Sequence, residues 1–252
     1  MSNDSVHLSI DDLGIATVTI ERPPVNALRF ADIAVINDTF KRIEEDEAVR
    51  VVVLTGAGER AFIAGADVHE LAALTPETAI SNTDLVQECV DRVYELRQPV
   101  ICAMNGPAIG SGVAFASASD IRVASTKATF HLPEVNLGVL GGSKHMARIA
   151  PPGATRLMMY TGWPMSAQEA YRLGAVDRLV EPGELMNEAM TIAKEIASKL
   201  PVAVRMAKDG LNRTEMMKLA EGYAYECGLT AELRRDPESA AQAQSFFERG
   251  KV

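Results

Sequence analysis

The sequence has no long hydrophobic run, although 47% of its 252 residues are hydrophobic. No apolar stretch approaches the roughly 18 residues that a membrane-spanning helix requires, so we expect no membrane span. Residues 1–7 are polar and form no apolar core, so the sequence predicts no secretory signal peptide. The hydrophobic content is typical of one large globular domain, or of one domain with a helical extension.

Cysteine, histidine and basic residues are also scarce. The three cysteines are far apart and form no CxxC pair, which is typical of reduced, mostly buried thiols in a cytoplasmic protein. The four histidines lack metal-ligand spacing, so we expect no metal site. Lysine and arginine number 25 against 34 acidic residues, the formal net charge is −9, and no basic run occurs. These charges argue against nucleic-acid binding.

The order of the apolar segments predicts an α/β fold with a mostly parallel sheet, because short apolar strands alternate with segments of helical spacing. The predicted strands span 7–11, 15–21, 51–54, 99–104 and 121–124, and the longer predicted helices between them span 27–47 and 75–96. The first two strands form a predicted hairpin. After Gly162 the pattern is helical, and four helices are predicted between 166 and 235.

Two glycine-rich turns follow buried strands. One contains Gly65, and the other is Gly110-Ser111-Gly112, which leads into a helix of small residues. A strand, a tight turn and a helix start leave free backbone N–H groups at one spot, where an anion or a transient oxyanion can bind. The alternative is that the glycines only permit close packing.

Glu134 lies in the segment Pro133-Glu134-Val135-Asn136-Leu137-Gly138, among apolar residues. A carboxyl group in apolar surroundings tends to have a raised pKa, which suits a general acid or base. The alternative is a surface glutamate that caps a turn, since glutamate is mostly exposed in proteins.

Further motifs lie before, between and after these segments. In chain order they are Glu21-Arg22-Pro23, Asn26-Ala27-Leu28, Val53-Leu54-Thr55-Gly56, Ala64-Gly65-Ala66-Asp67-Val68, Pro99 to Gly106, Asp120, Thr161-Gly162-Trp163, Ser166 to Ala170 and Gly174-Ala175-Val176. The whole series, with the two turns and the glutamate segment, resembles the enoyl-CoA hydratase/isomerase (crotonase) superfamily. The resemblance runs from about Ser9 to Phe247.

The resemblance implies a crotonase-like spiral of ββα units over residues 1–190. A helical trimerisation region would follow over 191–252, in a homo-trimer or homo-hexamer. It implies a coenzyme A thioester as the substrate and no permanently bound cofactor. It assigns the two oxyanion-hole donors to the backbone N–H groups of Ala66 and Ser111, where serine replaces the usual glycine. Phe246 and Phe247 resemble residues near the CoA of a neighbouring subunit.

The same resemblance assigns the contacts with CoA to two neighbouring segments. The residues concerned are Asn26, Ala27, Ala64, Asp67 and Val68. They would contact the adenine and pantetheine parts of the substrate.

The chain departs from the hydratase pattern at Ala114, where well-studied hydratases carry a second glutamate. Alanine cannot transfer a proton or hold a water molecule with its side chain. Glu134 would therefore act alone or with another group. His131, three residues earlier, and His145, in a glycine-rich segment, are the candidate helpers. The alternative for each is a turn or surface histidine.

We expect an enzyme that stabilises a thioester enolate, and hydration of a 2-enoyl-CoA is the preferred reaction. Single-glutamate members of the superfamily also isomerise double bonds or cleave C–C bonds in cyclic or aromatic acyl-CoA substrates, so Ala114 leaves these reactions open. A non-catalytic CoA-binding homologue is a further alternative, and the retention of Glu134 argues against it.

Overall fold

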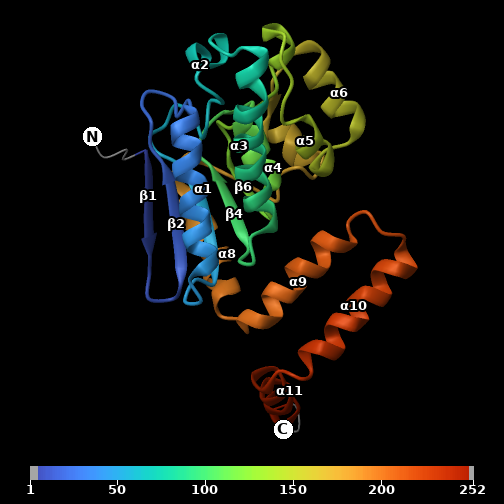
Figure 1. Ribbon diagram of the computed structural model, residues 1–252. Coiled ribbons are helices and arrows are strands. Elements are labelled where there is room, and N and C mark those ends of the chain that lie inside the picture. Colours follow the sequence, from blue (N-terminus) through green and yellow to red (C-terminus); the bar gives the residue numbers. More distant parts are fainter. Residues whose placement is uncertain (1–4, 250–252) are drawn as a thin grey trace.

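Six strands form the main sheet of the computed structural model, which describes residues 5–249 (Figure 1). They are β1 Val6–Ile10, β2 Ile15–Ile20, β3 Val51–Gly56, β4 Val100–Met104, β6 Ile121–Ser125 and β9 Arg178–Val180, in the spatial order β1-β2-β3-β4-β6-β9. β1 and β2 form the predicted antiparallel hairpin, and the other neighbouring strands run parallel. The predicted α/β class is confirmed.

Successive residues of the central strands face two different layers of helices, because side chains alternate along a strand. Val52 and Leu54 of β3 join a hydrophobic cluster with α1 (Phe30–Glu45) and α3 (Pro76–Glu95). Their neighbours in β3 join a second cluster with α8 (Leu185–Ala197), and α8 contacts β3, β4 and β6. Both faces of the sheet are covered, which explains the continuous apolar runs in its strands.

A second sheet of three short strands positions the candidate site. Its strands are β5 Ala108–Ile109, β7 Thr129–His131 and β8 Met165–Ser166. β5 pairs in parallel with β7, and Ile63 forms an isolated bridge with Ala108. α4 (Ser111–Ala118) follows β5, and the 3-10 helix η1 (Glu134–Leu137) follows β7. Both glycine-rich turns and Glu134 are thereby brought to one place.

The remaining helices lie around this core or form the C-terminal end of the described chain. They are α2 Val68–Ala72, α5 Ser143–Ile149, α6 Pro152–Thr161, α7 Ala167–Arg172, η2 Pro182–Glu184, α9 Pro201–Thr214, α10 Leu219–Leu233 and α11 Pro237–Arg249. The last three extend away from the sheet as a C-terminal arm, residues 201–249 (Figure 1). The predicted boundary at residue 190 falls inside α8, which packs on the sheet. The side chains of Phe246 and Phe247 lie outside the described residues.

The structure differs from the sequence expectation in two segments. The helix predicted from residue 27 begins at Phe30, because Leu28 is extended and forms a bridge with Ala66. The region after Gly162 also contains β8 and β9, and β9 adds an edge strand to the main sheet beside β6. Strands of two or three residues are too short for an alternating pattern to reveal them.

The three cysteines divide into two buried thiols and one exposed thiol. Cys89 on α3 and Cys102 on β4 are buried, and burial raises the pKa of both. Cys227 on α10 is exposed. No helix within residues 5–249 is both long enough and apolar enough to cross a membrane.

Gly112 should not tolerate a side chain. A Cβ atom there would lie 2.2 Å from the carbonyl oxygen of Ile63, so α4 would have to move away from the neighbouring segment. We expect Gly112→Ala to lower the free energy of unfolding by about 2 kcal/mol, as overpacked core positions do, measured by urea denaturation. Gly153→Ala on α6 is the matched control, because a Cβ atom there meets nothing within 4 Å. Equal stability of the two variants would contradict this packing.

Candidate active site

Two glycines from distant parts of the chain lie against each other at the centre of the candidate site. A Cβ atom on Gly110 would lie 3.8 Å from the Cα of Gly65, and one on Gly65 would lie 3.0 Å from the carbonyl oxygen of Ile109. Their φ angles are +55° and +87°, in the region that favours glycine. A side chain at either position would strain the backbone or push the two turns apart.

The residue after each glycine carries a backbone N–H group without an acceptor. The N–H of Leu28 donates to the Gly65 carbonyl, and the N–H of Asp67 donates to the Leu28 carbonyl, each at 2.7 Å. N–H groups alternate in direction along an extended segment, so the Ala66 N–H points away from Leu28. Ser111 is the first residue of α4, where the N–H has no partner within the helix. Neither N–H donates to any acceptor within residues 5–249.

Glu134 lies beside the second turn. Its Oε1 is 3.0 Å from the position of a Cβ atom on Gly110 and 3.8 Å from that on Gly141. The residue is only 8% exposed, and Oε2 is buried without a hydrogen-bond partner among the described residues. Burial raises the pKa of this carboxyl group, and a hydrogen bond from its own backbone N–H offsets part of the effect. The alternative of a solvated surface glutamate is therefore wrong.

Known proteins match this chain over almost its whole length. The family model described as enoyl-CoA hydratase/isomerase matches residues 11–252. The short-chain-enoyl-CoA hydratase of Clostridium acetobutylicum is 36% identical over 242 residues, or 94% of this chain and 93% of that protein. The crotonyl-CoA hydratase of Syntrophomonas wolfei is 36% identical over 202 residues, or 79% of this chain and 78% of that protein. The chain belongs to the enoyl-CoA hydratase/isomerase family.

A solved structure supports the same assignment through the fold. The enoyl-CoA hydratase from Bacillus anthracis is 31% identical to this hydratase/isomerase family member, with a TM-score of 0.92. The match covers 97% of this chain and 96% of that chain. The predicted crotonase-like fold is thereby confirmed.

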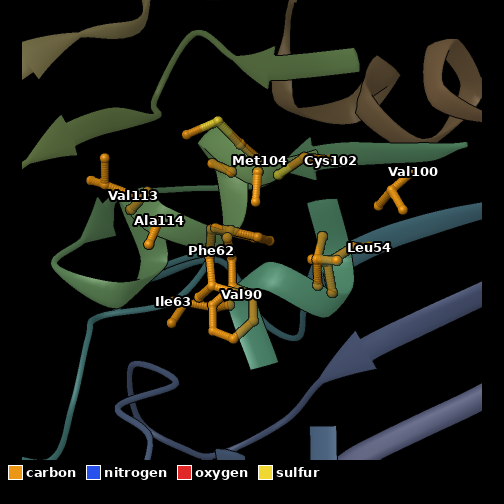
Figure 2. Close-up of a cluster of buried hydrophobic side chains, with 14 of the residues drawn as sticks. Leu54, Phe62, Ile63, Val90, Val100, Cys102, Met104, Val113 and Ala114 are labelled. Carbon is orange, nitrogen blue, oxygen red and sulfur yellow. The ribbon is translucent and has the colours of Figure 1, made fainter. Parts of the chain in front are cut away.

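In this member of the hydratase/isomerase family, the position of the second glutamate belongs to the hydrophobic core. Ala114 is buried and lies in the same hydrophobic cluster as Val113 and Ile63 (Figure 2). Its methyl group offers neither a proton nor a hydrogen bond. Ala114 therefore supplies no group that can transfer a proton, whereas Glu134 places a carboxyl group beside the second turn.

The two histidines have different neighbours. The His131 ring forms a hydrogen bond between Nε2 and the Gly162 carbonyl at 2.7 Å, and the His131 carbonyl accepts from the Gly110 N–H at 2.9 Å. His131 thus holds the second turn against the end of α6.

The charges that act on His145 come from α3, its own helix and the end of α9; they are Asp91, Arg148, Glu215 and Lys144. Burial lowers the pKa of His145, and no hydrogen bond or ion pair within residues 5–249 joins its ring to Glu134.

Asn26 is the most enclosed of the residues predicted to contact CoA. Its Nδ2 donates to the carbonyls of Ala57, Ala61 and Phe62 at 3.0 to 3.1 Å. Its Oδ1 accepts from the Arg22 N–H at 2.9 Å. The buried side chain therefore ties the turn before α1 to the segment that leads into Gly65, and it is not free to contact a ligand.

The other four predicted CoA contacts lie at an accessible edge. Ala27 and Ala64 are half-buried, and Val68 is exposed. Asp67 caps α2 by accepting from the His69 N–H at 2.9 Å, and this hydrogen bond is the main cause of its lowered pKa. These residues can meet a ligand without disturbing the core.

Sequence reasoning missed the ion pairs that hold this edge in place. Arg22 lies 3.0 Å from a carboxylate oxygen of Asp32 and 3.3 Å from one of Asp67. Burial opposes the ionised form of Asp32, but hydrogen bonds from the Arg29 side chain and backbone N–H lower its pKa to about 2. Arginine and aspartate lie ten residues apart in the sequence, so no local pattern indicates this pair.

Replacing the buried carboxyl group should stabilise the protein. The pKa of Glu134 is higher in the folded chain than in the unfolded chain, so its ionisation opposes folding as the pH rises through these values. We expect Glu134→Gln to raise the free energy of unfolding near pH 7 by about 1 kcal/mol. The gain should vanish below the ordinary glutamate pKa of about 4.3.

Urea denaturation between pH 4 and 8 measures this difference. Glu169→Gln is the control, because hydrogen bonding to Arg172 lowers the pKa of Glu169 and should give the opposite sign. A Glu134→Gln variant that is less stable than the wild type near pH 7 would contradict our inference that burial destabilises the ionised form of Glu134.

Proposed function

We propose that this protein hydrates 2-enoyl-CoA thioesters, with Ala66 and Ser111 as oxyanion-hole donors and Glu134 as the proton carrier. The observation that carries the proposal is the buried Glu134, whose Oε2 has no partner within residues 5–249, beside two adjacent turns. Each turn presents an N–H group that has no acceptor within the same residues. The hydratase names of the relatives described above support the same reaction.

In the proposed reaction the thioester oxygen accepts hydrogen bonds from Ala66 and Ser111. As the oxygen of water bonds to C3, the electrons of the C2–C3 double bond move toward the thioester oxygen and form an enolate. Glu134 takes the proton that the water loses. Each oxyanion-hole donor stabilises such a transition state by about 3 kcal/mol.

The second step returns this proton to the substrate. The enolate re-forms the thioester carbonyl, and C2 takes the proton from Glu134, which leaves the carboxylate as it began. One carboxyl group serves both steps, so Ala114 does not prevent hydration. The raised pKa of Glu134 suits this double role, because an acid-base group works best when its pKa is near the working pH.

Substrate binding would use two accessible edges of the site. The segments with Ala27, Ala64, Asp67 and Val68 would contact CoA. The exposed Val135, Leu137 and Leu140, which follow Glu134 directly, would contact the acyl chain. No permanently bound cofactor is needed for this chemistry.

We also propose that the protein forms a homo-trimer or homo-hexamer through residues 191–252. We propose that this assembly works in the cytoplasm.

Isomerisation of a 3-enoyl-CoA is the second candidate function, and Ala114 is the observation that favours it. A single carboxylate can take a proton from C2, which forms a dienolate, and return it to C4 without activating water. C–C bond cleavage in a cyclic or aromatic acyl-CoA uses the same enolate. A non-catalytic CoA-binding protein would gain nothing from the buried, unpaired carboxylate of Glu134, which costs free energy of folding.

A substrate panel separates these reactions. Crotonyl-CoA, a 3-enoyl-CoA and a cyclic β-keto acyl-CoA are compared, with product formation followed by chromatography. We expect crotonyl-CoA to be hydrated fastest, and Glu134→Gln to lower kcat at least about 100-fold. Glu169→Gln, on the exposed face of α7, should keep wild-type activity. Full activity of Glu134→Gln would exclude our role for this residue, and preferential turnover of another substrate would favour the second candidate function.

The oxyanion hole is tested by removing one N–H group. Proline is well tolerated at the first position of a helix, so Ser111→Pro removes this donor at the start of α4, whereas Ser111→Ala keeps it. We expect kcat on crotonyl-CoA to fall roughly 100- to 1,000-fold in Ser111→Pro and to change little in Ser111→Ala. Circular dichroism checks that both variants fold. Similar activity of the two variants would contradict the role of the Ser111 N–H.

A further inference from the structure

Arg148 of α5 holds the C-terminal end of α4. Its guanidinium donates hydrogen bonds to the carbonyl of Ser117 and, at 3.2 Å, to that of Ser119. These carbonyls belong to the last turn and the cap of the helix, which is the negative end of the helix dipole. Ser111 begins the same helix. Arg148 therefore fixes one end of an element whose other end presents a proposed oxyanion-hole donor.

The same guanidinium contacts the C-terminal arm. Its Nη1 lies 3.8 Å from Oε2 of Glu215, the residue that follows α9, and its centre lies 4.9 Å from the middle of the Tyr94 ring. The Tyr94 hydroxyl donates to the same Glu215 oxygen at 2.8 Å. Burial raises the pKa of Tyr94 to about 12, so the hydroxyl stays protonated and remains a donor. The contacts that Arg148 and Tyr94 make with Glu215 therefore connect the C-terminal arm to the rest of the chain.

A second bridge joins the arm to the same end of α4. Lys208 of α9 is buried, and its Nζ donates to Oδ2 of Asp120 at 2.8 Å and to the Gln98 carbonyl at 3.1 Å. Asp120 lies two residues beyond α4, and its Oδ2 also accepts from the Val100 N–H at 2.7 Å. The arm is thus connected to the end of α4 through two cations. Arg148 belongs to α5, and Lys208 belongs to the arm.

α4 is well suited to transmit a displacement from one end to the other. Its eight residues span about 12 Å, and all of them except Ser111 are buried. Closely packed segments move together and do not deform gradually. α5 reaches the site as well, because a Cβ atom on Gly142, which caps its start, would lie 3.2 Å from the Gly110 carbonyl oxygen.

We propose that Arg148 is a positioning residue that couples the C-terminal arm to the oxyanion hole. A change in the seating of α9 acts through Glu215 on Arg148, and through α4 on the Ser111 N–H. The inference rests on the proposed oxyanion hole. It goes beyond the proposed function because it makes turnover depend on how the arm is held.

Kinetics on crotonyl-CoA give the first test. We expect Arg148→Gln to lower kcat roughly tenfold to 100-fold, the effect of a small misplacement in a catalytic site, with KM little changed. Glu215→Gln should show a smaller loss. The double variant should be no slower than Arg148→Gln, because both substitutions interrupt one connection. Arg148→Lys, which keeps the charge, should recover part of the activity.

Arg172→Gln is the matched control, because Arg172 also pairs with a glutamate but sits exposed on α7, away from α4. It should keep wild-type kcat. If Arg148→Gln fails to fold, Glu215→Gln and Arg148→Lys still test the coupling. Wild-type kcat in Glu215→Gln and in whichever Arg148 variants fold would overturn the proposal.

A spectroscopic measurement separates this inference from the proposed reaction. Butyryl-CoA, which has no double bond to hydrate, is bound to each variant, and the stretching frequency of its thioester carbonyl is measured by infrared difference spectroscopy. We expect a downward shift in the wild type and Arg172→Gln, and a smaller shift in Arg148→Gln and Glu215→Gln. An unchanged shift in the last two overturns the coupling, and no shift in the wild type overturns the oxyanion hole itself.

That measurement remains informative when crotonyl-CoA is not hydrated. In that case the proposed reaction fails, while a carbonyl shift that depends on Arg148 still supports the coupling. Conversely, normal hydration by the wild type together with wild-type kcat in both Arg148→Gln and Glu215→Gln refutes the coupling alone.

Discussion

The close approach of two backbone turns, at Gly65 and Gly110, is the constraint on which the rest of the site depends. A Cβ atom on Gly65 would lie only 3.0 Å from the Ile109 carbonyl oxygen, and each turn has a positive φ angle that favours glycine. The pairing of Ile63 with Ala108, and of β5 with β7, holds the turns together. The helix start at Ser111 and the extended segment at Ala66 then present their N–H groups from fixed positions.

Two buried polar atoms at the site have no hydrogen-bond partner among the described residues. They are Oε2 of Glu134 and Oγ of Ser111. Ser111 follows Gly110, and the other carboxylate oxygen of Glu134, Oε1, lies 3.0 Å from the position of a Cβ atom on Gly110. Such atoms cost free energy of folding. Asn26, in contrast, makes four side-chain hydrogen bonds. A substrate carbonyl or a water molecule would supply hydrogen-bond partners for these two atoms.

The sequence was sufficient to predict the strands of the sheet centre, the two turns and Glu134, because apolar runs, glycines and an enclosed carboxylate are local signals. It did not reveal that the Asn26 side chain donates hydrogen bonds to backbone carbonyls, since those carbonyls lie more than 30 residues away in the sequence. The two-residue strands of the second sheet were also missed. Arg148 carries no local signal at all, because its importance comes from where α4, α3 and α9 meet. Long-range pairing, which no local pattern encodes, decides these features.

The positions of the three cysteines bear on how a change in the seating of the arm can be observed. Cys89 and Cys102 are enclosed in the body, and their raised pKa values leave almost no reactive thiolate. Cys227 lies exposed on α10, within the arm that Arg148 connects to α4. The unaltered chain therefore offers a single attachment point for a fluorescent or spin label, and that point lies on the arm and not on the body that carries the sheet.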